Sequence, residues 1–317
     1  MKIKQLLAIL MAFALVLALV ACDDTGTGGE GGATTPAVTG GGGTPASSEA
    51  GTDTPEPSDF DTEKDINVYT REDGSGTRSA FIDIVGLSEN DTVLITEDAD
   101  IINGTGTLRT AVANNEVGIG YISYGAKNDE IKVLNIDGVA PSAATMLDET
   151  YKLQRPFNLI YKGELSDSAQ DFWNFIFSIE GQKIITDDNL VQHPDNADAK
   201  PFESNKASGT ITVGGSTSIN DIMVKLREAY NAHADTAVTV MIEGGGSGTG
   251  ETSTVSGVFD IGMVSREVRA EGVEEGVLAI DGIVVIVNKA NPLESLTMDE
   301  LKGIYLGEIE VWAEVID

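Results

Sequence analysis

The pattern of apolar and polar positions changes character twice along the chain. A continuous apolar stretch covers residues 6–21, and residues 23–65 are mostly Gly, Thr, Ser, Pro, Ala and acidic residues without apolar periodicity. From residue 66 onward, short runs rich in β-branched residues alternate with amphipathic segments of helical period. A segment like 23–65 cannot bury enough surface to offset its chain entropy. We therefore predict a flexible linker over 23–65 and a folded body over 66–317.

Within the body, strands and helices are predicted to alternate. The predicted strands cover 66–69, 117–123, 132–136, 157–161, 210–213, 238–242, 259–263 and 282–287. The predicted helices cover 77–85, 108–114, 168–178, 219–232 and 249–256, and residues 202–208 form a connector. This alternation predicts an α/β fold with largely parallel strand pairing.

Residues 1–22 are predicted to be an export signal. Two lysines precede the apolar stretch, which is shorter than the about 20 residues that a transmembrane helix needs. The stretch ends in Leu19-Val20-Ala21-Cys22, which resembles the lipobox of bacterial lipoproteins, and Cys22 is the only cysteine of the chain. The resemblance implies cleavage before Cys22 and lipid attachment to its sulfur. The mature protein would then be anchored on the extracytoplasmic side of the cell membrane.

Composition excludes several classes of partner. The chain has 20 Lys and Arg against 51 Asp and Glu, a formal net charge of −31. Such a chain repels phosphodiester backbones, so we expect no nucleic-acid partner. One cysteine excludes an internal disulfide, and one cysteine with two histidines argues against a structural zinc site. We expect neither a metal nor another cofactor.

Candidate chemistry concentrates in three loops of small residues, each between a predicted strand and a predicted helix. They read REDGSGTR at 71–78, GGSTS at 214–218 and GGGSGT at 244–249. A helix start presents unpaired N–H donors and a partial positive charge, and Ser or Thr adds a hydroxyl donor. One such loop also fits ordinary helix capping. Three of them together predict an anion-binding site.

Two arginines and one acid are candidates beside these loops. Arg71 stands at the mouth of the first loop, where a guanidinium can bind an oxyanion with paired hydrogen bonds and Asp73 could orient it. Arg266 is a second candidate. No loop ends in Gly-Lys-Ser/Thr, and Gly245-Gly246-Ser247-Gly248-Thr249 lacks the last glycine of G-x-S-x-G. We therefore expect a binding protein and not an enzyme.

At these residues the chain resembles the phosphate-binding proteins of ABC uptake systems, which have the type II periplasmic binding-protein fold. The resemblance also rests on DIGMVSRE at 260–267, AIDGI at 279–283, GIGY at 118–121 and SIEGQK at 178–183. It implies two α/β lobes with an anion in the cleft between them. It further implies inorganic phosphate as ligand and an ABC permease in the membrane as partner.

The order of the segments departs from the family. The segments that come later in the family occupy about 66–200 here, and those that come first occupy about 208–317. We therefore expect a circular permutation, with lobe A formed by about 66–125 plus 288–317 and lobe B by about 126–287. Halves of two truncated tandem copies, or halves that complete each other between two chains, are the alternatives.

The resemblance also implies site residues. The ligand-binding residues would be Arg71, Ser75, Gly76, Thr77, Thr217, Ser218, Ser247, Gly248 and Ser265. Arg266 stands where some members carry an Asp that accepts the proton of hydrogen phosphate, so sulfate or another tetrahedral anion remains an alternative ligand. A surface sensory or interaction protein that retains the fold is the alternative function.

Overall fold

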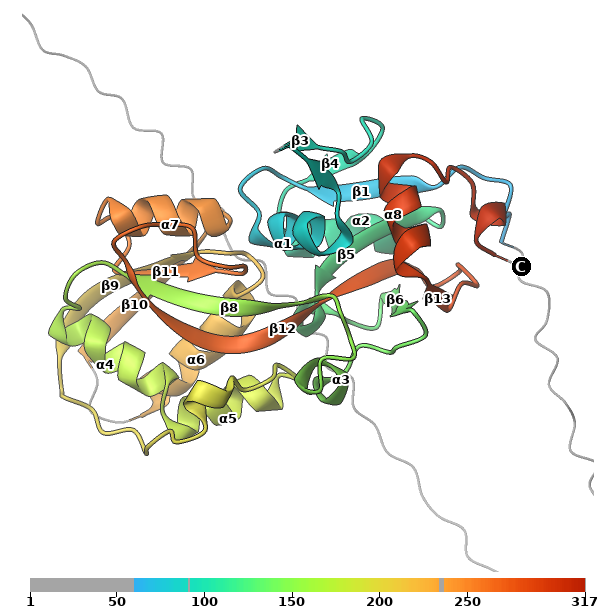
Figure 1. Ribbon diagram of the computed structural model, residues 1–317. Coiled ribbons are helices and arrows are strands. Elements are labelled where there is room, and N and C mark those ends of the chain that lie inside the picture. The colour runs from blue at the N-terminus through green and yellow to red at the C-terminus, as the bar shows by residue number, and fades with distance from the viewer. Residues whose placement is uncertain (1–59, 91, 234–236, 317) are drawn as a thin grey trace, which may run out of the picture. The chain divides into compact units, whose positions relative to one another are not determined.

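The computed structural model describes residues 60–90, 92–233 and 237–316 (Figure 1). The predicted export signal, Cys22 and linker residues 23–59 lie outside the described residues. The helices are α1 Gly76–Val85, α2 Thr105–Ala113, α3 Ala143–Leu147, α4 Asp167–Ile176, α5 Ile179–Asp187, α6 Asn220–Ala232, α7 Ser247–Val255 and α8 Met298–Leu306. The strands are β1 Asn67–Arg71, β2 Ser88–Glu89, β3 Thr92–Val93, β4 Asp100–Ile102, β5 Gly118–Ser123, β6 Ile131–Val133, β7 Asn135–Ile136, β8 Gln154–Tyr161, β9 Ser208–Gly215, β10 Ala237–Gly244, β11 Ile261–Val264, β12 Glu274–Asn288 and β13 Ser295–Leu296. The predicted α/β fold is confirmed.

One mixed sheet organises the described residues. Its strands follow the order β10-β9-β11-β8-β12-β5-β1-β4, and β6 also pairs with β12. Pairing is parallel among β9, β10 and β11 and among β1, β4 and β5, as the sequence predicts. The prediction is wrong for the central strands β8 and β12, which run antiparallel to their neighbours. Strand β8 lies between β11 and β12 and runs opposite to both, and β12 also runs opposite to β5.

The two central strands connect two lobes. Residues 274–282 of β12 pair with β8, and residues 283–287 pair with β5 (Figure 1). We define the first lobe as residues 60–153 and 283–316 and the second lobe as residues 154–282. Each lobe is built on its own parallel strands, and only β8 and β12 run through the middle of the sheet between them.

The core of the first lobe lies on both faces of its sheet. Alternate residues of a strand point to opposite faces, so Tyr121 packs with α1 and α8 while the adjacent Ile122 packs with α2. The segment 126–153, expected in the other lobe, belongs here because its apolar side chains fill this core. Those side chains are Leu134, Ile136, Met146, Tyr151 and Leu153, all buried.

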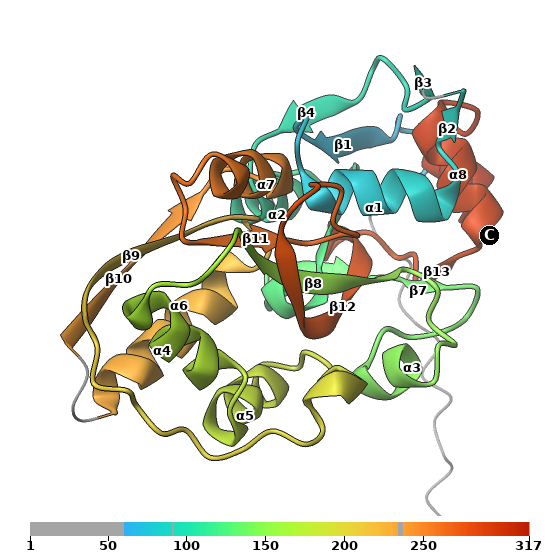
Figure 2. The same cartoon turned by 60° about the vertical axis from the view of Figure 1, so that its left-hand side comes forward.

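The second lobe buries its apolar residues against three helices. Ile211 and Val213 of β9 and Val240 of β10 pack with Phe172 of α4 and Tyr230 of α6. Helices α4, α5 and α6 lie on one side of β9 and β10, and α7 lies on the other (Figure 2). The aromatic stripe of the segment 168–178 is therefore core, with Phe172 and Phe175 fully buried.

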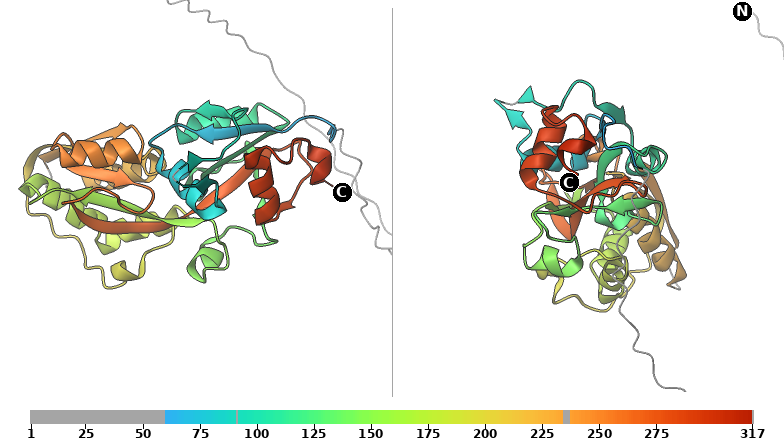
Figure 3. Two further views of the ribbon diagram at one scale, coloured as in Figure 1. Left: turned by 45° about the horizontal axis from the view of Figure 1, so that its top comes forward. Right: turned by 90° about the vertical axis from the view of Figure 1, so that its right-hand side faces the viewer.

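The two ends of the described body lie against each other (Figure 3). The Ile66 amide donates to the Glu310 carbonyl at 2.7 Å, and Asp65 forms a β-bridge with Val311. The Phe60 ring meets the buried Trp312 ring edge to face, with centroids 6.0 Å apart. Residues 60–65 were expected in the linker but belong to the folded body, because Phe60 supplies an apolar contact that composition alone does not reveal. None of the helices in the described ranges is long and apolar enough to span a bilayer.

Candidate functional site

The carboxyl ends of the parallel strands bring the predicted loops to one edge of each lobe. In the second lobe, Gly215 of β9 pairs with both Gly244 of β10 and Met263 of β11, so these three strands end together. In the first lobe, Arg71 at the end of β1 pairs with Ile102 at the end of β4. Loops at such an edge are where open α/β sheets bind ligands.

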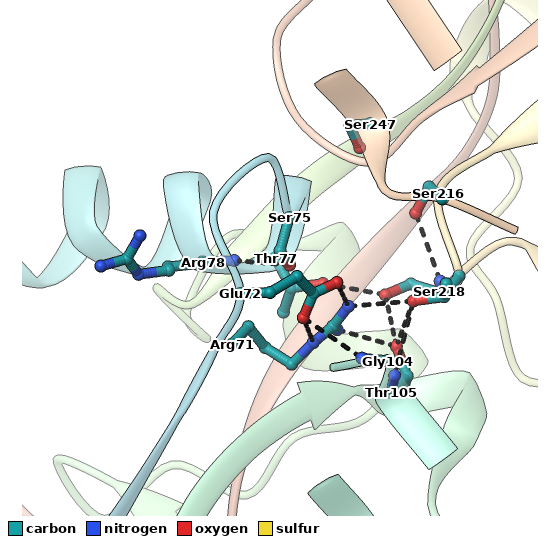
Figure 4. Close-up of polar contacts among 12 residues, drawn as sticks. Arg71, Glu72, Ser75, Thr77, Arg78, Gly104, Thr105, Ser216, Ser218 and Ser247 are labelled. Carbon is teal, nitrogen blue, oxygen red and sulfur yellow. Dashed lines mark hydrogen bonds and ion pairs between the residues drawn. The ribbon is translucent and has the colours of Figure 1, made fainter. Parts of the chain in front are cut away.

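Arg71 lies at the centre of the contact between the two lobes (Figure 4). Its side chain is 1% exposed. The Nη1 atom donates to the Thr105 hydroxyl of the first lobe at 3.0 Å, and Nη2 donates to the Thr217 hydroxyl of the second lobe at 3.0 Å. The guanidinium therefore joins Thr105 and Thr217, which are 112 positions apart in the sequence.

The carboxylate that orients Arg71 is Glu72 and not Asp73. Glu72 accepts hydrogen bonds from Nε and Nη2 of Arg71, both at 2.7 Å, and a third from the Gly104 amide at 3.2 Å. Burial by itself raises the pKa of Glu72, but the hydrogen bonds and charge of Arg71 outweigh burial and hold this pKa below its ordinary value. Asp73 is exposed and pairs with Arg78, which points away from the cluster (Figure 4). The expected role of Asp73 is therefore wrong, because the turn after Glu72 directs Asp73 to solvent.

A group of hydroxyls surrounds the Arg71 guanidinium. The Thr77 and Ser218 oxygens lie 2.8 Å apart, and the Thr105 and Ser218 oxygens lie 3.1 Å apart. Thr77 and Thr105 stand in the first turns of α1 and α2, while Thr217 and Ser218 precede α6. Three helix starts therefore present hydroxyls to one buried volume, as the loop sequences predict for two of them.

A second group of hydroxyls adjoins the first and consists of Ser216, Ser247 and Ser265, which we call the serine triad. The Ser216 hydroxyl donates to the Ser265 oxygen at 2.8 Å, and the Ser247 and Ser265 oxygens lie 3.2 Å apart. The Ser218 amide donates to Ser216 at 3.2 Å, so the two groups are continuous. A Cβ at Gly76 would lie 2.1 Å from the Ser247 oxygen, so only glycine lets α1 approach the triad this closely.

Two expected donors are engaged locally. The Ser75 hydroxyl accepts the Arg78 amide at 3.3 Å and is the N-cap of α1. The Gly248 amide donates to the Gly74 carbonyl at 3.0 Å and thereby ties the loop before α7 to the loop before α1. Both residues lie at the lobe contact, where these hydrogen bonds fix the loops before α1 and α7.

Arg266 does not face the hydroxyl groups. Its Nη1 and Nη2 atoms donate to the two carboxylate oxygens of Glu251 at 2.9 and 2.7 Å, and both residues are buried. Burial raises the pKa of Glu251, but the hydrogen bonds from Arg266 and the Arg269 amide lower it more, so the net shift is downward. The expected supporting role of Arg266 beside the ligand is therefore wrong, because Glu251 of α7 occupies its guanidinium.

Sequence reasoning missed Thr105 and Glu72. Thr105 follows Asn103-Gly104, and the run Gly104-Thr105-Gly106-Thr107 has the same small-residue composition before a helix as the three loops that were recognised. That composition could have identified it. Glu72 could not have been separated from Asp73, because both flank the same turn and only the backbone path decides which one meets Arg71.

The site combines compensated charges with neutral donors. Arg71 pairs with Glu72, Arg266 with Glu251, and the buried Arg155 with Asp281 at 3.1 Å. Each guanidinium near the loops therefore has its own carboxylate, and hydroxyl and amide donors make up the rest of the surface. In the described part of the chain, no group of three or more His, Cys, Asp or Glu is arranged to hold a metal ion. The arrangement suits a small oxyanion that accepts many hydrogen bonds.

Comparison with known proteins assigns the chain to a family. A model described as PBP superfamily domain matches residues 55–180 and 200–316. The phosphate-binding protein PstS 2 of Streptococcus pneumoniae is 38% identical over 257 residues, which are 79% of this chain and 87% of that protein. The crystal structure of a phosphate-binding protein of a phosphate ABC transporter from Streptococcus pneumoniae is 38% identical and covers 80% of this chain and 100% of its own, with a TM-score of 0.65. The phosphate-binding protein PstS of Bacillus subtilis is 30% identical over 129 residues, 38% of this chain and 41% of that protein. The two-lobe architecture and these matches establish that the chain belongs to the PBP superfamily and, within it, to the PstS family of phosphate-binding proteins of ABC transporters.

Proposed function

We propose that the chain binds inorganic phosphate between its lobes and delivers it to an ABC permease. The observation that carries the proposal is the Arg71 guanidinium, buried and bonded to hydroxyls of both lobes at 3.0 Å. The relatives named as phosphate-binding proteins support the choice of ligand. The ligand-binding residues we propose are Arg71, Ser75, Gly76, Thr77, Thr105, Thr217, Ser218, Ser247, Gly248 and Ser265.

Hydrogen-bond donors that touch the ligand, rather than the net charge of the chain, account for anion binding by so acidic a protein. Screening at physiological salt acts over roughly 8 Å, so distant carboxylates weigh less than donors that touch the ligand. Hydrogen bonds to a charged group contribute about 1.5–3 kcal/mol each. About five to eight of them, less the costs of desolvation and lobe closure, correspond to a dissociation constant of about micromolar.

The order of the two halves supports a circular permutation. The described ends, at Phe60 and Ile316, belong to one folded lobe, and Asp65 pairs with Val311. The match to the Bacillus subtilis protein covers less than half of either chain, whereas the match to the Streptococcus pneumoniae protein covers 79% of this chain and 87% of that protein. We therefore propose that the order of the halves is shared with the latter protein and is permuted relative to the former. Residues 200–208 would then be the junction that joins the former ends.

We also propose that a lipid on Cys22 anchors the protein to the outer side of the cell membrane. The lipobox resemblance supports the anchor, and the roles named for the relatives in ABC transport support an extracytoplasmic position. A membrane-tethered receptor stays close to its permease, whereas a released one is diluted. If the protein were a sensor instead, cells lacking it would retain normal phosphate uptake.

Replacing Arg71 with alanine is expected to weaken phosphate binding by an order of magnitude or more, since a charged donor is lost and the half-buried Glu72 is left without its cationic partner. Calorimetric titration with phosphate, sulfate and molybdate measures the affinity and the preference together. The exposed Lys183→Ala, which removes a cation paired with Asp187 within α5, serves as the control, with no change expected. An unchanged affinity in Arg71→Ala would refute the assigned site, and tighter binding of sulfate than of phosphate would change the ligand.

Replacing Gly76 with alanine is expected to weaken phosphate binding about tenfold or more. The new methyl group would overlap the Ser247 and Ser265 oxygens, at 2.1 and 2.6 Å, and hold the lobes apart. Gly106→Ala is the matched control, because Gly106 also lies in the first turn of a helix and has nothing within 4 Å of the added carbon. Equal affinities for the two variants would show that close approach at Gly76 is not needed.

Replacing Cys22 with serine is expected to move the mature protein from the membrane fraction to the soluble fraction. The hydroxyl of serine cannot form the thioether to the lipid, so the anchor is lost. Fractionation of expressing cells followed by immunodetection measures the distribution. Retention in the membrane fraction would contradict the anchor but not the ligand site.

A chain that places residues 201–316 before residues 60–200, joined by a short Gly/Ser linker, is expected to fold and to bind phosphate with the affinity of the natural order. The two ends to be joined already lie side by side, so closing a short linker between them costs little conformational entropy. Circular dichroism and calorimetry measure the outcome. A reordered chain that remains unfolded would count against the permutation.

A further inference from the structure

Arg155 is a buried cation next to the serine triad that the proposed site does not yet use. It belongs to β8, and its side chain is 1% exposed. The Nε and Nη2 atoms donate to one carboxylate oxygen of Asp281 at 3.2 and 3.1 Å. The Nη1 atom instead donates to the Ser265 carbonyl at 3.0 Å and reaches the Ser265 hydroxyl at 3.4 Å. One side of the guanidinium is therefore neutralised by Asp281, and the other side holds Ser265.

Ser265 connects Arg155 to the rest of the triad. Its amide donates to the Ser247 hydroxyl at 2.9 Å, and its own oxygen accepts the Ser216 hydroxyl at 2.8 Å. A hydroxyl oxygen has two lone pairs and one proton. Because Arg155 and Ser216 both donate to the Ser265 oxygen, its lone pairs are occupied and its proton is left as a donor.

The partner carboxylate extends this arrangement to the first lobe. Asp281 of β12 is fully buried and also accepts the Ser123 hydroxyl, at the end of β5, at 2.8 Å. Arg155 and Asp281 thus lie on the two central strands and contact residues of both lobes. Burial lowers the pKa of Arg155, and the negative charge of Asp281 opposes this shift. The positive charge of Arg71 lowers the pKa further, so the guanidinium groups of Arg71 and Arg155 are near enough to repel each other.

Stability alone does not account for a buried pair of this kind. Replacing a buried ion pair with apolar residues of similar size is often neutral or stabilising, because desolvation offsets the attraction of the charges. The contacts that an apolar pair cannot reproduce are the bond from Arg155 to Ser265 and the bond from Ser123 to Asp281, and only the first of them reaches the serine triad.

We propose that Arg155 is a positioning residue of the anion site, which fixes Ser265 and thereby leaves the hydroxyl protons of Ser265 and Ser247 as donors to the ligand, while the Ser216 proton is given to Ser265. The inference rests on the proposed function, since it assigns a role toward the same oxyanion. Arg155 does not touch the ligand itself in this account. In this account Arg71 contacts the anion at the lobe contact, and Arg155 keeps the serine triad in a fixed position through Ser265.

The test compares Arg155→Met with the double variant Arg155→Met/Asp281→Leu. The single variant leaves the Asp281 carboxylate buried and unpaired, so its melting temperature is expected to fall. The double variant removes both charges and is expected to recover much of that stability. Neither variant can hold Ser265, so both are expected to bind phosphate at least tenfold more weakly than the unmodified chain in calorimetric titrations below their melting temperatures.

Phe172→Leu is the matched control for lost stability, because Phe172 is fully buried in the second lobe away from the loops. It is expected to lower the melting temperature and leave the phosphate affinity unchanged. Recovery of full affinity in the double variant, or an equal loss of affinity in Phe172→Leu, would overturn the positioning role. If the unmodified chain binds no phosphate in the same titration, the proposed function fails and this inference with it.

Discussion

The whole site depends on one buried guanidinium that is bonded to both lobes. Arg71 reaches Thr105 in its own lobe and Thr217 in the other, both at 3.0 Å, while Glu72 fills the remaining side of the fork. A buried charge without partners would be too costly to keep, so the surrounding groups must be donors and acceptors in fixed positions. The hydroxyls at three helix starts meet this requirement, and they are also the groups that an oxyanion would use.

Charge compensation explains how an acidic chain can present an anion site. Each arginine of the site region has its own carboxylate, so the local surface is nearly neutral and binding relies on short-range donors. Neutral donors at fixed positions select a ligand by its shape and by the number of hydrogen bonds that it accepts, and not by its charge alone. The same logic makes Ser265 important, since its orientation decides whether the triad donates or accepts.

Close approach of the backbone is the second requirement of the site. Gly76 lets α1 lie against Ser247 and Ser265, and the bond from the Gly248 amide to the Gly74 carbonyl ties the two loops together. The central strands β8 and β12 join the lobes that carry these loops. The paired ends of the body, at Asp65 and Val311, lie in the first lobe.

The sequence by itself determined the elements beside the three loops, because hydrophobic period and helix-start composition are local properties. It did not predict the helices α3, α5 and α8 or the short strands β2, β3, β4 and β13. It predicted the strands and helices around the three loops, and Arg71, Thr77, Thr217, Ser218, Ser247 and Ser265 do converge. The sequence did not predict which side chains pair where the partner lies elsewhere in the chain or where two neighbouring residues could both serve. Only the tertiary structure decided that Glu72 rather than Asp73 pairs with Arg71, that Glu251 occupies Arg266, and that Arg155 stands behind Ser265. The first outcome depends on the path of the backbone through a turn, and the second on how α7 packs beside the segment that follows β11. The third depends on a contact between residues 110 positions apart in the sequence, and no local pattern encodes any of them.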